Sequence, residues 1–69
     1  MDKDVARALL ILAKSLDEVI VKMFGEVEKI ADDGLRARFH QAVGDLMGAV
    51  ARDIIFPIEN LHDDLRADR

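Results

Sequence analysis

Few side chains in this sequence could carry out a reaction on their own. The chain contains no cysteine, tyrosine or tryptophan, and its only serine, Ser15, has no histidine near it in the sequence. A serine hydroxyl needs an adjacent base before it becomes a useful nucleophile. The acidic pairs at residues 32–33 and 63–64 stand where helix ends are expected, and capping and solvation explain them. We therefore predict no catalytic residue and no cofactor, and the sequence favours a protein that is not an enzyme.

Glu59 and His62 have the spacing of two metal ligands on a helix. Side chains three residues apart share a helical face, and a carboxylate with an imidazole suits iron or manganese. This E-x-x-H spacing resembles the ligand motif of ferritin-like di-iron bundles, which implies a metal site between paired helices. Such sites add a glutamate from the facing helix, but antiparallel pairing places residues 4–7 opposite Glu59, and none of these is glutamate. The other interpretation of the pair is a solvated helix end.

His40 is the other histidine with possible chemistry. Gly44 follows it in the motif F-H-Q-A-V-G, which resembles the helix of histidine phosphotransfer modules, where a small residue follows an exposed histidine. That resemblance implies phosphate transfer through the imidazole, although Val43 stands where those modules carry a lysine. The alternative is a histidine at the edge of an interface, paired with a carboxylate.

The composition indicates a small folded protein that needs stabilisation from a partner. Of its 69 residues, 51% are hydrophobic and 35% are charged, and the net charge is −4. A chain of this length buries a modest part of its surface, and without cysteine it has no disulfide to compensate. The negative charge also disfavours binding to a phosphate backbone.

No stretch of the sequence has the length of a membrane-spanning helix. The longest run without a polar side chain covers six residues, 8–13, whereas a bilayer helix needs about 20. We therefore expect no membrane span and a cytoplasmic protein, a location that the lack of cysteine also fits.

Apolar residues recur at intervals of three and four through both halves of the chain, as on one face of a helix. We predict a helix over about 3–31 and a second over about 34–55, and we expect the two stripes to face each other. The turn between them has Asp33 or Asp32 as N-cap, and its shortness imposes an antiparallel hairpin. The stripes are Val5, Leu9, Leu12, Leu16, Val19, Met23, Val27 and Ile30, then Leu35, Phe39, Val43, Leu46, Val50, Ile54, Leu61 and Leu65.

Pro57 interrupts the second helix. Its ring clashes with the preceding turn and it has no N–H to donate. Because the apolar spacing continues beyond it, we expect either a kink or a break with a short third helix over about 57–67.

The two helices carry more apolar side chains than a single hairpin can bury, and each large side chain buried is worth ~1.5–3 kcal/mol. We therefore predict an all-α hairpin that forms a homodimeric four-helix bundle or a higher oligomer, with a compact three-helix monomer as the alternative. Two glycines with small-xxx-small spacing suggest close helix approach. The predicted interface residues are Leu10, Ile11, Val21, Phe24, Gly44, Gly48, Ile55 and Phe56.

These features favour a structural or regulatory protein that acts through helix–helix contacts with itself or with another protein. The patch around Ile55, Phe56 and Pro57 could receive a partner helix. The metal-binding bundle with Glu59 and His62 is the alternative. A dimer of hairpins also resembles the plasmid copy-control protein Rop in architecture, which implies nucleic-acid binding. Here, however, basic and acidic residues are interleaved, and no tyrosine or tryptophan can stack on bases.

Overall fold

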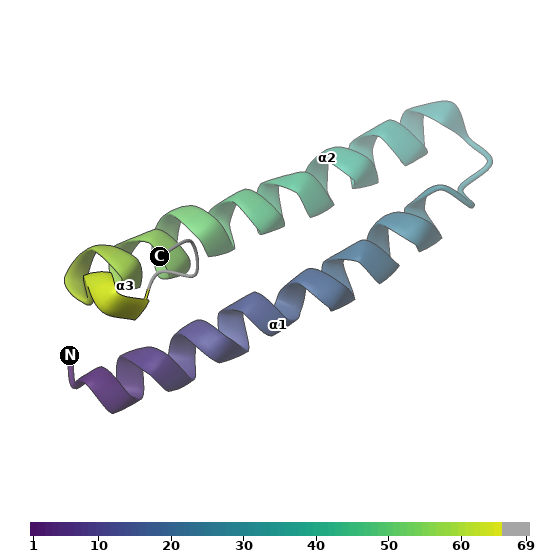
Figure 1. Ribbon diagram of the computed structural model, residues 1–69. Helices are drawn as coiled ribbons and strands as arrows, with labels where there is room; N and C mark the ends of the chain where they lie inside the picture. The colour runs from purple at the N-terminus through teal and green to yellow at the C-terminus, as the bar shows by residue number, and fades with distance from the viewer. Residues whose placement is uncertain (66–69) are drawn as a thin grey trace.

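The two stretches of the chain with apolar residues at helical spacing form two helical arms, joined by one turn, that pack against each other. The computed structural model describes residues 1–65. Helix α1 covers Lys3–Val27, helix α2 covers Asp33–Val50, and a π-helical turn over Ala51–Ile55 leads into helix α3 over Phe56–Leu61. The arms lie antiparallel (Figure 1), which confirms the predicted all-α hairpin with a kink in its second arm.

The turn between α1 and α2 is held by side chains at the start of α2. Asp32 is the N-cap, since its Oδ1 accepts the N–H of Leu35 at 2.8 Å. The Arg36 guanidinium donates to the carbonyl of Ile30 at 3.0 Å. Asp32, rather than Asp33, therefore starts the second helix. The turn spans residues 28–32, so α1 ends earlier than the apolar spacing suggested.

The core of the hairpin consists of two apolar clusters, one near each end. At the turn end, Phe24 and Ile30 pack on a buried cluster drawn from α1 and α2. At the other end, α3 contributes to a cluster with the beginning of α1. The buried members are Ile20, Val27 and Val43 in the first cluster and Ala6, Leu10 and Ile58 in the second; Ala13 and Val50 are buried as well.

The face that α1 presents to the rest of the chain is not the regular stripe of the sequence. The buried positions are Ala6, Leu10, Ala13, Ile20 and Val27, whereas the stripe from Val5 to Met23 is exposed. The stripe therefore faces the second helix only near the turn, where Val27 packs on Val43 and Val19 and Met23 line a groove with α2. Alanines at two of the buried positions let the neighbouring backbone approach closely, and the larger Leu10 and Ile20 pack beside that contact.

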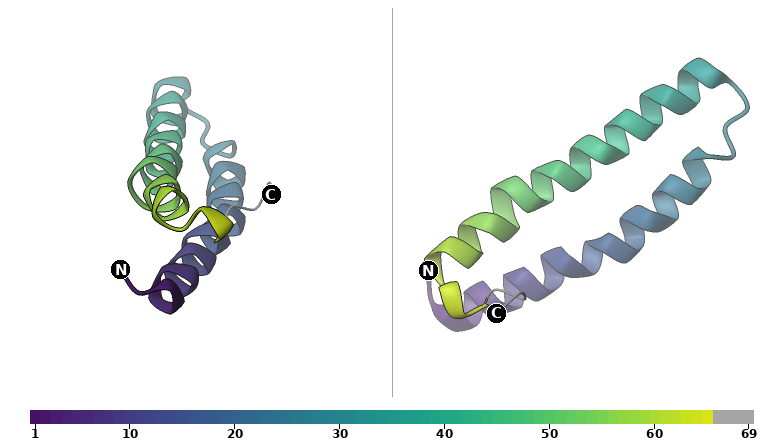
Figure 2. Two further views of the ribbon diagram at one scale, coloured as in Figure 1. Left: turned by 60° about the vertical axis from the view of Figure 1, so that its left-hand side comes forward. Right: turned by 45° about the horizontal axis from the view of Figure 1, so that its top comes forward.

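A π turn and Pro57 together redirect the second arm. The Phe56 N–H donates to the carbonyl of Ala51, one residue further back than in an α-helix. The extra residue widens the turn just before the proline, and Pro57 then occupies the start of α3, where a missing N–H matters least. As a result, α3 folds across the beginning of α1 (Figures 1 and 2) and places Ile58 in the core, where it is 2% exposed.

The second arm ends soon after α3. His62 has non-helical angles (φ −129°, ψ 81°), and a short 3-10 turn over Asp63–Leu65 follows. Leu65 packs on the cluster around Ile58, and Lys3 forms an ion pair with Asp64. The end of the expected third helix, residues 66–67, lies outside the described residues.

The docking of α3 gives a stability prediction. Ile58→Ala should lower the free energy of unfolding by about 2–5 kcal/mol, because it removes a buried side chain that packs on Ala6 and Leu10. Leu61→Ala, in the same helix but 64% exposed, should change it by less than about 0.5 kcal/mol. Urea denaturation followed by circular dichroism measures both, and equal losses would contradict the docking of α3.

Candidate functional site

The main surface feature is a row of large apolar side chains along α1. These residues alternate in steps of four and three, which is the spacing of the a and d positions of a coiled-coil heptad. Each of them is exposed, from 39% at Met23 to 65% at Leu12. We call this row the α1 seam; its members are Val5, Leu9, Leu12, Leu16, Val19 and Met23.

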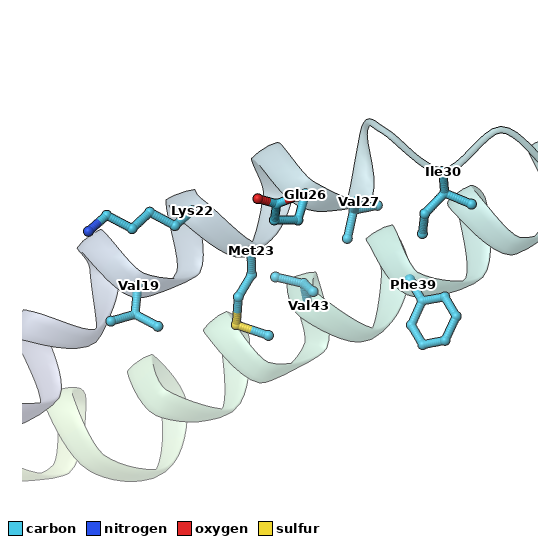
Figure 3. Close-up of a pocket in the computed structure, with 8 residues that line it drawn as sticks. All are labelled: Val19, Lys22, Met23, Glu26, Val27, Ile30, Phe39 and Val43. Atoms are coloured by element: carbon cyan, nitrogen blue, oxygen red, sulfur yellow. The ribbon is translucent and has the colours of Figure 1, made fainter.

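A groove between the helices shows that α2 contributes to the same side of the hairpin. It has a volume of about 470 Å³, and Val19 and Met23 of the α1 seam line it together with Phe39 and Val43 of α2 (Figure 3). Phe39 is exposed, as are Leu35 and Leu46, which lie four residues before it and seven after it and so share its helical face.

The α1 seam and these three residues of α2 therefore form one apolar surface, which we call the open face. It extends along a molecule measuring 46 × 20 × 16 Å. Apolar residues exposed singly are normal in soluble proteins, but a contiguous apolar surface is typical of an interaction site.

Charged side chains border the groove without crossing it. Lys22 and Glu26 line its edge, and in Figure 3 the Lys22 side chain extends away along α1. Both form ion pairs with near neighbours in the sequence, Lys22 with Glu18 at 3.9 Å and Glu26 with Lys29, just beyond the end of α1, at 3.2 Å. These charges keep the rim hydrated while the floor of the groove stays apolar.

The structure distributes the predicted interface residues between the core and the surface. Leu10 is buried, and Phe24 and Ile55 pack against the two core clusters, so these side chains already have partners within the chain. Ile11, Val21 and Phe56 are exposed. None of these three belongs to the open face as defined above.

Gly44 and Gly48 do not bring two helices together within this chain. Apart from the helix's own backbone and the adjoining residues, a Cβ built on either residue would meet no atom within 4 Å. Their role in an interface between chains therefore stays a prediction, and the small residues buried on α1 are Ala6 and Ala13.

Glu59 and His62 are not presented together on one helix. The Glu59 side chain is 15% exposed and its Oε2 lies 3.3 Å from the Nζ of Lys14. A straight second helix would place residues 4–7 opposite Glu59. The kink shifts α3 along α1, so Lys14 lies opposite Glu59 instead. The His62 ring follows the end of α3, and its Nε2 lies 3.2 Å from the Met1 carbonyl. Within residues 1–65, no three His, Asp, Glu or Cys side chains group as metal ligands.

The other histidine is part of an aromatic contact. The His40 ring lies 5.0 Å from the Phe24 ring, centroid to centroid, at an interplanar angle of 48°. Such tilted packing fixes the imidazole against α1 at the edge of the turn-end cluster. The contact that the structure shows for His40 is therefore with an aromatic ring of its own chain, and its place at the edge of an interface stays a prediction.

Most basic side chains in the described part of the chain are matched by acidic ones. Arg52, for example, pairs with Asp53 at 2.9 Å and lowers the pKa of that carboxyl through the hydrogen bond, and Lys3 acts in the same way on the pKa of Asp64. Ion pairs also engage Arg7, Lys14, Lys22, Lys29 and Arg36. A nucleic-acid interface requires a continuous basic surface, and this interleaving does not supply one.

Comparison of the chain with protein-family models, curated proteins and solved structures finds no match. Among residues 1–65, no helix has the length and apolar character needed to span a membrane.

The Lys14–Glu59 contact predicts a measurable coupling between α1 and α3. A double-mutant cycle with Lys14→Met and Glu59→Gln should give a coupling energy of about 0.5–1 kcal/mol, since the pair is partly shielded from water. The matched cycle on the exposed pair Glu18 and Lys22 should give less than about 0.5 kcal/mol. Chemical denaturation measures both cycles, and a Lys14–Glu59 coupling no larger than that of the exposed pair would contradict the docked position of α3.

Proposed function

We propose that this chain is a structural or regulatory protein that works through helix–helix contacts, and that two copies form a four-helix bundle by covering each other's open faces. The observation that carries the proposal is the α1 seam. A helix with two apolar faces, one of which its own chain leaves exposed, is typical of a subunit of a larger assembly.

The energetics favour association. Full burial of a large apolar side chain is worth ~1.5–3 kcal/mol, so a half-exposed one gains about 1 kcal/mol when it is covered. The open face contributes nine such side chains from each copy, hence about 18 kcal/mol for a pair. Association costs about 4–15 kcal/mol in lost freedom of motion. The gain exceeds this cost, so burial of the open faces favours association.

A second copy is a suitable partner on grounds of shape and spacing. Stable interfaces bury about 800 Å² on each partner, and the open face extends about 27 Å along α1 from Val5 to Met23 on a molecule that measures 46 × 20 × 16 Å. The heptad spacing of the α1 seam is the pattern through which helices of separate chains interlock. A two-fold axis would place the same surface on both copies.

A substitution in the seam tests the proposal against an adjacent control. Leu12→Asp should raise the dimer dissociation constant by about 100-fold or more, because each dimer loses two buried leucines and gains two buried charges. Ile11→Asp, the neighbouring exposed position outside the open face, introduces the same residue into the same helix and should leave the dimer intact. Sedimentation equilibrium measures both constants.

Two results would overturn the proposal. One is a wild-type chain that sediments as a 7.7 kDa monomer at every concentration. The other is an equal weakening of the dimer by Leu12→Asp and Ile11→Asp, which would place the interface elsewhere.

A further inference from the structure

We propose that the two copies lie antiparallel, with α1 of each packed along α1 of the other, so that Val5 and Leu9 of one copy fill the groove of its partner. This inference rests on the proposed dimer and specifies its arrangement. The groove is then a site that a single chain leaves incomplete.

Only two arrangements bring the open faces together about a two-fold axis. If the axis runs parallel to the helices, the turn ends lie together and α1 covers α2 of the other copy. If the axis runs across the helices, the turn ends lie at opposite ends of the bundle and α1 covers α1 of the other copy.

The position of the groove favours the second arrangement. Its lining from α1 runs from Val19 to Val27, all in the half of the helix nearest the turn, and Ile30 of the turn adds to it. With the turn ends together, one groove would lie over the other and leave a large void, which close-packed interfaces avoid. With the turn ends apart, each groove lies beneath the first half of the other α1, where the exposed Val5, Leu9 and Leu12 project.

The uneven distribution of large side chains on α2 points the same way. On the open face these end at Leu46, and the next positions in the same heptad spacing hold Ala49 and, in the π-helical turn, Asp53. With the turn ends together, the register that sets Met23 opposite Phe39 would place Leu12 against Ala49 and Leu9 against the exposed carboxylate of Asp53. In the antiparallel arrangement the α1 seam meets another α1 seam along its length, which is the apolar pairing that a heptad pattern requires.

Cysteine cross-linking distinguishes the arrangements, because the natural chain contains no cysteine. A disulfide forms only when two Cα atoms lie within about 7 Å. If Val5 and Leu9 of one copy fill the groove of the other, the two-fold axis passes near Leu16. Met23 then lies opposite Leu9 of the other copy. Leu16→Cys should therefore cross-link to itself, and a mixture of Leu9→Cys with Met23→Cys should give a heterodimer. Each should react at least ~10-fold faster than Ile11→Cys, which lies outside the interface and reports random collision.

The competing arrangement has its own signature, since it sets Met23 opposite Phe39 of the other copy. A Met23→Cys and Phe39→Cys mixture that cross-links, with no Leu16→Cys product, overturns the antiparallel arrangement while leaving the dimer in place. The antiparallel arrangement is also overturned if the variants are dimeric by mass under reducing conditions and none of these pairs cross-links. A monomeric wild-type chain overturns the dimer itself and with it this inference.

Discussion

The structure depends on one constraint: α1 is a single straight helix with apolar side chains on two faces, and its own chain can cover only one of them. The second arm buries the face of α1 that carries Ala6, Leu10, Ala13 and Ile20. The α1 seam lies on another face of the helix and remains exposed to water. A buried core thus coexists with an exposed row of apolar side chains, and this division favours a second chain as the missing part of the core.

The kink determines how far the second arm can protect α1. The π turn and Pro57 swing α3 across the beginning of α1, where Ile58 enters the core and Glu59 meets Lys14. This docking closes the open end of the hairpin and covers Ala6 and Leu10. It does not reach the α1 seam, so the hairpin is stabilised at its end while one side stays available for contact.

Hydrophobic spacing and turn chemistry predicted the helices, the antiparallel hairpin and the bend at Pro57. They did not predict which face of α1 packs inward, because two apolar faces look alike until the size of the side chains is considered. The strict four-three spacing of the α1 seam and the alanines at 6 and 13 were the available signals. The partner of Glu59 also escaped prediction. In a straight helix, the residues that lie opposite the first arm follow from the sequence alone. The π turn adds one residue, and the resulting shift of α3 depends on tertiary packing.

A bundle formed through the open faces would explain why so small a chain, without disulfides, carries so many exposed apolar residues. The solution mass of the wild-type chain, measured by light scattering over a wide range of concentration, tests this claim most directly. A mass of twice 7.7 kDa that falls towards 7.7 kDa only on strong dilution is expected. A constant mass of 7.7 kDa at all concentrations would contradict it.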